Sequence, residues 1–210
     1  MNMWWNMGKI ILDLCGGTGA WSKPYKDAGY DVRVITLPEH DVHEYILDCQ
    51  PYGILAAPPC DMFSYARLTP STPRDLRGAM RVVSRCLEII WESQYNIKTT
   101  ISKRTPLKFW AIENSNGMLK YFLGLSAFVF HPYEFGDPYK KSTNLWGWFC
   151  NPVKSPVMPD KINISKLGTT ELQKYHGNIP REFKIKGRKD KILRAITPPG
   201  FAKAFFEANQ

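Results

Sequence analysis

The sequence predicts an α/β fold in which a mostly parallel sheet carries helices on both faces. Two observations lead to this fold class. Short apolar or β-branched runs alternate with helix-forming segments over the first 115 residues. In addition, three clusters of chemically unusual residues each follow such a run directly, as ligand-binding residues do at the ends of parallel strands.

The first three strands are predicted from short apolar segments. Residues 9–14 (KIILDL) lead into a glycine-rich turn at 15–19, and a helix is expected over 20–29. Residues 31–37 (DVRVITL) are rich in β-branched side chains and predict a second strand. Residues 53–57 (GILAA) predict a third strand, which the two prolines at 58 and 59 end abruptly.

The rest of the chain adds a long helix, a fourth strand and a terminal helix. Residues 109–112 (FWAI) predict a strand that runs into Glu113 and Asn114, and the segment after 152 is expected to be irregular. An amphipathic helix over 201–208 is expected to close back onto the sheet. A surface helix over 75–91 is predicted by apolar residues at helical spacing: Leu76, Met80, Val83, Leu87 and Ile90.

Composition and charge narrow the class of protein. The 210 residues suit one compact unit, and with 44% hydrophobic and 22% charged residues the chain is typical of a globular protein. We expect a soluble, cytoplasmic protein, because no apolar run reaches the ~20 residues of a membrane span and residues 1–9 lack a signal-peptide pattern. Five cysteines without a CxxC pair indicate a reducing compartment, and no metal site is expected.

The excess of basic residues is concentrated near the carboxyl end. The chain has 28 basic and 19 acidic residues, a net charge of +9. Within residues 181–194, seven basic and two acidic side chains give 7 − 2 = +5. A basic segment of this kind predicts a polyanionic partner.

The glycine-rich turn is the first candidate site. Between Asp13 and Gly19 the missing side chains would let the backbone approach a bound nucleotide or adenosyl group. The turn does not match a P-loop or a dinucleotide fingerprint. Without other residues to support it, it could equally be a tight connection that binds nothing.

The other two clusters supply a thiol and a carboxylate. Cys60 follows two prolines that fix the backbone, as a nucleophilic thiol on an accessible turn requires. Glu113 ends an apolar strand, where partial burial can raise its pKa and let it protonate a ring nitrogen. Taken singly, the cysteine could instead fill the strand end and the glutamate could form a surface ion pair.

Together, in this order, the three clusters resemble the DNA cytosine-5 methyltransferase family. Residues 13–21 (DLCGGTGAW) are similar to its cofactor motif, 58–64 (PPCDMFS) to its proline-cysteine loop and 113–115 (ENS) to its Glu-Asn-Val motif. Residues 198–205 (PPGFAKAF) resemble its final motif, whose helix completes the cofactor pocket. The resemblance covers roughly residues 1–150 and 192–210.

This resemblance implies a Rossmann-like, S-adenosylmethionine-dependent methyltransferase sheet. An acidic residue near the adenine is implied at Asp41, beside Val42, and Glu39 is a candidate for holding the ribose hydroxyls. The implied cofactor-binding residues are Asp13, Leu14, Cys15, Gly16, Gly17, Thr18, Gly19, Trp21, Glu39, Asp41, Val42 and Pro58.

The family mechanism would assign Cys60 as the nucleophile toward cytosine C6 and Glu113, with its neighbour Asn114, to the N3 side of the base. A Gln-x-Arg-x-Arg motif that supports the base in the family is replaced within residues 137–143, where Lys141 stands for the first arginine and Thr143 for the second. The base must leave the duplex to reach such a site.

The resemblance also implies double-stranded DNA as the partner of a monomeric enzyme. Residues 61–78 would form a mobile loop over the DNA. The catalytic domain would comprise residues 1–150, followed by a small basic recognition segment at 151–191 and a returning helix at 192–210. The residues expected to contact nucleic acid are Ser64, Arg67, Arg74, Arg181, Lys184, Lys186, Arg188, Lys189 and Arg194.

Other functions remain open at the level of sequence. The recognition region is only about 40 residues long, so RNA could replace DNA, and a small phage or restriction-modification enzyme in a bacterial cell fits this size. An approximate alignment places Arg194 near the methyl donor, where a guanidinium could favour carboxy-S-adenosylmethionine. A non-catalytic nucleic-acid-binding protein is the alternative from another class.

Overall fold

A computed structural model describes residues 8–67, 72–95, 107–155, 162–176 and 189–210. The strands are β1 (Ile10–Leu14), β2 (Asp31–Ile35), β3 (Gly53–Ala56), β4 (Phe109–Ser115), β5 (Phe128–Phe130), β6 (Tyr139–Lys140), β7 (Thr143–Trp148) and β8 (Ile162–Asn163). The helices are α1 (Lys23–Asp27), α2 (Leu76–Tyr95), α3 (Lys120–Leu123), α4 (Thr169–His176), α5 (Lys189–Ala195) and α6 (Pro199–Ala208), with short 3-10 turns η2 (Pro132–Phe135) and η3 (Ile164–Lys166).

Six strands form one sheet in the order β2-β1-β3-β4-β7-β5. The first four run parallel, β7 is antiparallel to β4, and β5 is antiparallel to β7. The chain adds β2 on one side of β1 and then returns to add β3 on the other side. In open α/β sheets such a reversal creates a crevice outside the carboxyl ends of the two strands, here β1 and β3, where ligands bind.

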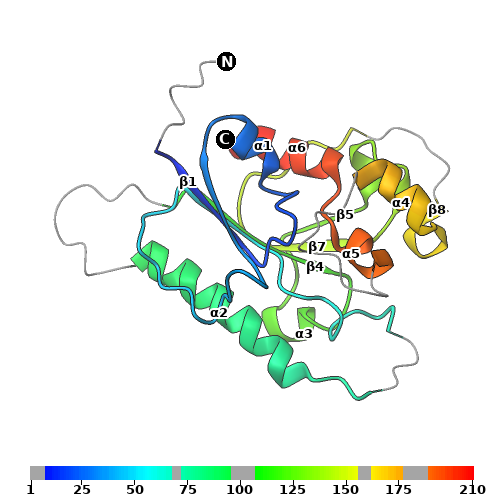
Figure 1. Ribbon diagram of the computed structural model, residues 1–210, viewed down its shortest axis with the longest axis horizontal. Coiled ribbons are helices and arrows are strands. Elements are labelled where there is room, and N and C mark those ends of the chain that lie inside the picture. The colour runs from blue at the N-terminus through cyan, green and yellow to red at the C-terminus, as the bar shows by residue number, and fades with distance from the viewer. Residues whose placement is uncertain (1–7, 68–71, 96–106, 156–161, 177–188) are drawn as a thin grey trace.

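Helices cover both faces of the sheet, as the sequence predicts (Figure 1). On one face α1 and α6 pack over Ile11, Leu55 and Phe109. On the opposite face α2 packs over Leu12 and Ile54. Adjacent residues such as Ile11 and Leu12 of β1 point to opposite faces of the sheet, because side chains alternate along a strand. The central strands are therefore apolar throughout, as is typical of parallel sheets buried on both sides.

Several element boundaries differ from the sequence-based expectation. The predicted helix over 20–29 is reduced to α1, because the glycine turn continues in turns up to Ser22. The fourth strand is longer than predicted and includes Glu113, Asn114 and Ser115, since β7 pairs with it along its whole second half. Helix α2 begins at Leu76 and extends to Tyr95, one turn beyond the predicted end.

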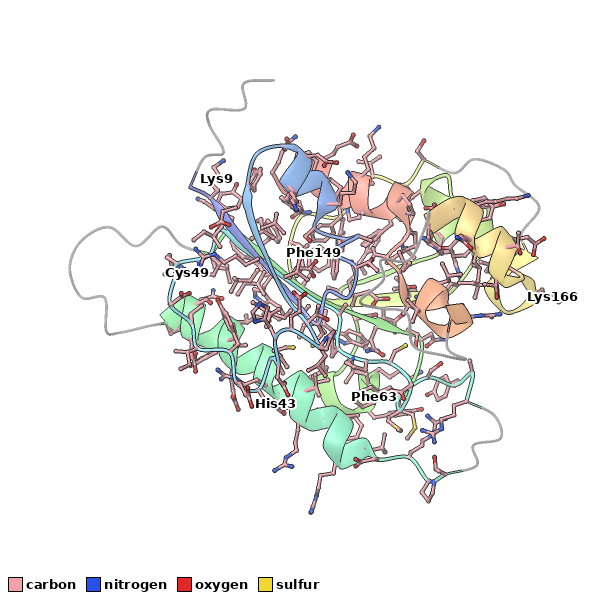
Figure 2. All side chains as sticks on the ribbon, viewed as in Figure 1. Lys9, His43, Cys49, Phe63, Phe149 and Lys166 are labelled. Carbon is pink, nitrogen blue, oxygen red and sulfur yellow. The ribbon has the colours of Figure 1, made fainter. Side chains whose placement is uncertain are left out.

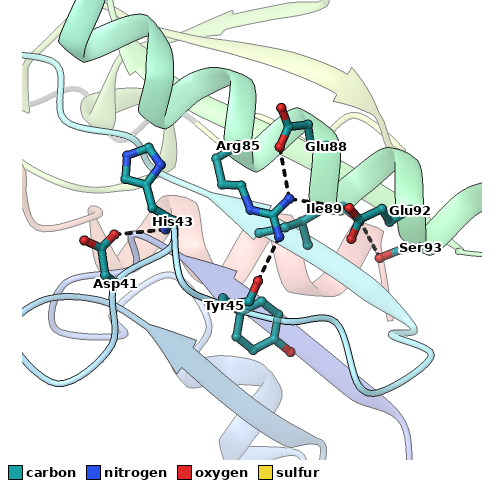
Figure 3. Close-up of polar contacts among 8 residues, drawn as sticks. All are labelled: Asp41, His43, Tyr45, Arg85, Glu88, Ile89, Glu92 and Ser93. Atoms are coloured by element: carbon teal, nitrogen blue, oxygen red, sulfur yellow. Dashed lines mark hydrogen bonds and ion pairs between the residues drawn. The ribbon is translucent and has the colours of Figure 1, made fainter.

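Arg85 joins α2 to the segment that follows β2 (Figure 3). Its guanidinium donates to the Tyr45 carbonyl oxygen at 2.8 Å and forms ion pairs with Glu88 at 3.0 Å and Glu92 at 3.4 Å. A half-buried arginine that binds a loop carbonyl fixes the loop more firmly than an exposed ion pair would. The loop between β2 and β3 is thereby held against the long helix.

A small lobe, which comprises β6, β8, η3, α4 and α5, lies beside the sheet, at the right in Figure 1. It has its own apolar core of Tyr139, Leu167, Leu172, Leu193 and Ile196. The expected recognition segment spans residues 151–191. This core also includes Tyr139, which precedes that segment, and Leu193, which follows it. The described part of the small lobe is thus built from three stretches of chain.

Helix α6 returns to the sheet, and both of its ends are fastened. At its start the Asp137 carboxylate accepts a hydrogen bond from the Gly200 N–H at 3.2 Å, which places a negative group at the helix N-terminus. Burial raises the pKa of Asp137 to about 6. At its end the Asn209 side chain exchanges two hydrogen bonds with the backbone of Cys150, at 2.8 and 2.9 Å.

Candidate active site

The glycine turn after β1 is organised around Asp13. This carboxylate is fully buried and accepts a hydrogen bond from the Ser22 hydroxyl at 2.5 Å. A side chain at Gly16 would come within 2.3 Å of the Asp13 carboxyl carbon, so only glycine fits there. Burial raises the pKa of Asp13 to about 6. Asp13 therefore shapes the turn from within and is shielded from solvent.

The outer side of the same turn is open. Cys15, Gly17 and Gly19 have positive φ angles of 55°, 54° and 70°, which turn the backbone sharply after the strand. The N–H of Gly17 donates to the Thr36 hydroxyl at 3.2 Å, and a side chain added at Gly17 would meet nothing within 4 Å. The backbone at Gly17, beside half-buried Thr18, can therefore be approached closely by a ligand.

The other expected cofactor residues divide between surface and core. Glu39 is exposed, and the Asp41 carboxylate accepts a hydrogen bond from the His43 N–H at 2.9 Å (Figure 3). Leu14 and Val42 are buried in the apolar layer under α2. The two carboxylates lie just beyond the carboxyl end of β2, where they can meet a ligand bound at the neighbouring turn.

Trp21 belongs to the core. Its side chain is 1% exposed, and its ring lies against the Phe201 and Phe205 rings of α6, with centroids 5.9 and 5.3 Å away. Stacking on an adenine, which its place beside the glycine turn would allow, would require an exposed ring face. The sequence cannot reveal this, because Trp21 and its aromatic neighbours are about 180 residues apart.

Cys60 lies on a turn that is tied to two strands. The N–H of Ala57 donates to the Leu14 carbonyl of β1 at 2.9 Å, and the Asn114 side-chain amide of β4 donates to the buried Pro58 carbonyl at 2.9 Å. The carbonyl of Cys60 in turn accepts from the Ser64 N–H at 2.8 Å. Asn114 thus positions the turn that carries the thiol.

Glu113 reaches the same place from β4. Its carboxylate lies 4.0 Å from the Lys141 ammonium, and the two side chains are only 16% and 15% exposed. Burial raises the pKa of Glu113, while the positive charge of Lys141 acts to lower it. Lys141 stands on the two-residue link between β6 and β7, and the pairing of β7 with β4 brings it beside Glu113.

The Cys60 thiol lies within the electrostatic reach of both groups. Burial raises its pKa, Lys141 lowers it, and Glu113 raises it. The Ser115 hydroxyl also acts to lower this pKa, although its oxygen has no hydrogen-bond partner of ordinary geometry. The structure therefore brings together Cys60, Glu113 and Lys141, which are up to 81 residues apart in the sequence.

Lys141 also connects the site to the small lobe. Its ammonium donates to the Arg194 carbonyl oxygen at 3.1 Å. The Arg194 guanidinium donates to the carbonyl oxygens of Ile164 at 3.0 Å and Leu167 at 3.2 Å. Arg194 thus lies inside the small lobe, where its guanidinium binds the backbone at η3.

Two residues near the site had no sequence signal. The Tyr139 hydroxyl lies 3.2 Å from His176 Nε2. Burial raises the pKa of Tyr139, and the charges of Asp137 and Glu113 raise it further. Burial lowers the pKa of His176 to about 4, with Lys141 acting in the same direction. A neutral histidine–tyrosine pair therefore lies behind Lys141, formed by folding of the small lobe over β6.

The two arginines expected to contact phosphates are bound within their own loop. The Arg74 guanidinium donates to the carbonyl oxygens of Met62 at 2.6 Å, Ser64 at 2.9 Å and Arg67 at 3.2 Å. The Arg67 guanidinium donates to the Thr72 carbonyl and hydroxyl, both at 2.8 Å, and contacts the sulfur of Met62. In this structure these arginines hold the loop in shape.

Most of the basic run falls outside the described residues. Arg181, Lys184, Lys186 and Arg188 lie outside them, and Lys189 is described only as the first residue of α5. Across the described ranges no helix is both long and apolar enough to span a bilayer, and no group of three or more His, Cys, Asp or Glu side chains could hold a metal ion.

No family model and no curated protein matches the chain.

Proposed function

We propose that this protein is an S-adenosylmethionine-dependent cytosine C5-methyltransferase that acts on DNA. The observation that carries the proposal is the meeting of Cys60 and Glu113 beside Lys141 at the carboxyl edge of the sheet. A thiol, a buried carboxyl group and a cation in one place match the three tasks of this chemistry: attack on C6, contact with N3 and support of charge.

The residues around β1 fit an adenosyl group. The backbone of the turn is open at Gly17, and the exposed carboxylate of Glu39 and the half-buried carboxylate of Asp41 follow the adjacent strand. Carboxylates at this place in a doubly wound sheet hold ribose hydroxyls. S-adenosylmethionine, when bound there, supplies an activated methyl group.

Cys60 begins the proposed reaction. Because burial raises its pKa, the thiol must first lose its proton to solvent, and the Lys141 charge favours the thiolate that results. The sulfur then forms a bond to C6 of the cytosine. Asn114, through Pro58, holds the turn in place while this bond forms.

Glu113 acts on the opposite edge of the ring. Because burial raises its pKa, this carboxyl group takes up a proton more readily than an ordinary glutamate and can pass a hydrogen bond or a proton to N3 as the C6 bond forms. Electron density then collects at C5, the carbon that takes the methyl group. A solvent base takes the C5 proton, the C5–C6 double bond re-forms as the bond from sulfur to C6 breaks, and N3 returns its proton to Glu113. Cys60 leaves as the thiolate in which it began.

A mechanism-based trap tests the proposal. With a duplex that contains 5-fluorocytosine, the C5 substituent cannot leave as a proton, so the bond between Cys60 and C6 persists. We expect a denaturation-resistant adduct that requires S-adenosylmethionine, and mass spectrometry should place it on Cys60.

Two variants make this trap specific. Cys60→Ser should form no adduct, whereas Cys150→Ser, which removes an exposed thiol outside the site, should form it normally. Absence of an adduct in the wild-type protein on both duplexes and single strands of random sequence would overturn the proposal. Substitution of a structured RNA for the duplex tests whether the substrate is RNA.

A further inference from the structure

An exposed aromatic pair lies next to the Cys60 turn. Tyr65 and Tyr121 are 40% and 70% exposed, and their hydroxyl groups are hydrogen-bonded at 3.0 Å. The Lys120 ammonium lies over both rings, 5.5 Å from the centre of Tyr65 and 5.4 Å from that of Tyr121. Phe122 is 48% exposed and extends the apolar area toward buried Phe63.

The pair is fixed relative to Cys60 by backbone contacts. Ser64 forms an isolated antiparallel bridge with Gly117, and the Met118 N–H donates to the Phe63 carbonyl at 2.8 Å. A side chain at Gly117 would lie 2.3 Å from that carbonyl oxygen, so the two segments touch closely. Phe63, labelled in Figure 2 near α3, is fully buried in this joint.

The two segments in contact are those that carry the reacting groups. One follows Cys60 directly, and the other follows Glu113 at the end of β4. The aromatic surface of Tyr65, Lys120, Tyr121 and Phe122 is therefore continuous with the place where the target base would enter. Exposure of so many aromatic atoms on one edge is typical of a surface that meets a partner.

The composition of this surface suits a nucleotide. Flat aromatic rings stack on nucleobases irrespective of sequence, and a lysine above them can contact the adjoining phosphate. Stacking needs an open base face, which paired bases inside a duplex do not offer. The surface therefore favours a nucleotide that is unpaired beside the target.

We propose that Tyr65, Lys120, Tyr121 and Phe122 bind an unpaired nucleotide next to the target cytosine, so that single-stranded or locally opened DNA is the preferred substrate. This inference rests on the proposed function, which identifies the cytosine as the target base. The binding itself does not depend on catalysis and can be measured without S-adenosylmethionine.

Fluorescence of 2-aminopurine tests the stacking. Single-stranded oligonucleotides with 2-aminopurine on either side of one cytosine should be quenched on binding, and fully paired duplexes should be quenched less. Tyr121→Ala should weaken binding of the single strand by about tenfold, because stacking of one base contributes ~1–3 kcal/mol. Tyr121→Phe, which keeps the ring, should restore most of the affinity.

Tyr95→Ala is the matched control, because Tyr95 is also about half exposed but lies at the far end of α2. Equal affinity of wild type and Tyr121→Ala for the single strand would overturn the inference, as would a preference for the intact duplex. A Cys60 adduct with an unchanged Tyr121→Ala affinity would leave the proposed function standing. Binding that depends on Tyr121, without any Cys60 adduct, would support the nucleotide-binding surface and contradict the proposed methyltransferase function.

Discussion

At Cys60, burial and charge act on the thiol in opposite directions. Removal from water disfavours the thiolate, while the ammonium of Lys141 favours it and the carboxylate of Glu113 opposes it. The reactivity of the free protein is therefore set by two neighbours that can be changed one at a time. Alkylation reports that reactivity directly, since only the thiolate reacts.

We predict opposite shifts of the Cys60 pKa for the two neighbours. Glu113→Gln removes a negative charge, so the pKa should fall and alkylation at pH 7.5 should become faster. Lys141→Met removes the positive charge, so the pKa should rise and alkylation should slow. Iodoacetamide labelling across pH, followed by mass spectrometry of the Cys60 peptide, measures both, and shifts of the same sign would contradict the assignment.

A second residue-scale prediction concerns Asp13. Its pKa is raised from 3.8 to about 6 in the folded protein, so the folded state binds a proton more readily than the unfolded chain. Stability should therefore be greatest at low pH in this window and fall as pH rises from about 4 to 6, by ~1.4 kcal/mol per unit of pKa difference. Asp13→Asn carries no such charge, so it should lose this dependence.

Urea unfolding of both proteins between pH 4 and 7 provides the measurement. The stability of Asp13→Asn relative to wild type should increase with pH by about 3 kcal/mol in total. Asp137 has a similarly raised pKa, but it is present in both proteins and cancels. Parallel curves for the two proteins would contradict the prediction.

The meeting of Cys60 and Glu113 could be predicted from sequence because each follows an apolar run that forms a strand. In a parallel sheet the ends of such strands meet at one edge, so short local patterns suffice. Trp21 could not be placed in this way, since the same glycine-turn motif is compatible with a stacking ring or a core ring. The choice is made by Phe201 and Phe205, which no local pattern links to it.

Among the elements, the loop between Cys60 and α2 depends most on a single side chain. Arg74 satisfies three carbonyl oxygens in it, which only a forked, multi-donor group can do. Because the loop also carries Tyr65, its shape determines both the Cys60 turn and the aromatic surface. The sequence favoured phosphate contact for this arginine, since an arginine in a polar loop gives no sign of an internal role.

We predict that Arg74→Lys loosens this loop while the sheet stays folded. One ammonium cannot replace three separate N–H contacts, so stability should fall by about 1–3 kcal/mol. Trypsin should cut within residues 61–75 much faster than in wild type. Arg77→Lys, at an exposed position one residue into α2, is the control and should behave as wild type.

The insertion of β7 is the element that sequence reasoning missed. The pairing of β7 between β4 and β5 depends on contacts far along the chain. That pairing extends β4 through Glu113 and Asn114 and carries Lys141 to the site. A mostly parallel sheet follows from the βα pattern, whereas the antiparallel insertion does not.

For the whole molecule, Lys141 links the six-stranded sheet to the small lobe. The lobe fixes the Arg194 backbone through η3, and the Arg194 carbonyl holds the Lys141 ammonium. The lobe carries the end of the basic segment 181–194, which is expected to meet DNA. This segment is therefore connected through Arg194 to Lys141, the residue whose charge favours the Cys60 thiolate.

We predict that Arg194→Ala raises the pKa of Cys60 although the two residues do not touch. Loss of the bonds to Ile164 and Leu167 frees the lobe, and Lys141 should spend less time near the thiol. Alkylation of Cys60 should slow at fixed pH, with thermal unfolding measured in parallel. Arg81→Ala on the exposed side of α2 is the control, and an unchanged alkylation profile for Arg194→Ala would contradict the link.

A second whole-molecule prediction concerns salt. If the basic segment binds phosphates, replacement of Arg181, Lys184, Lys186 and Arg188 by serine should flatten the dependence of DNA affinity on salt. The slope of log K against log salt should fall by roughly 0.9 for each lost contact with duplex DNA. Fluorescence anisotropy between 50 and 300 mM salt measures it, and an unchanged slope would assign the phosphate contacts elsewhere.

Helix α6 has a consequence for how the protein is made. Its residues Phe201, Ala202 and Phe205 complete the core over β1 and β3, the strands that carry the glycine turn and the Cys60 turn. Ribosomes synthesise the amino end first, so one apolar face of these strands stays uncovered in the nascent chain until α6 has left the exit tunnel. The thiol site can therefore take its final shape only after α6 has been translated and has reached the sheet.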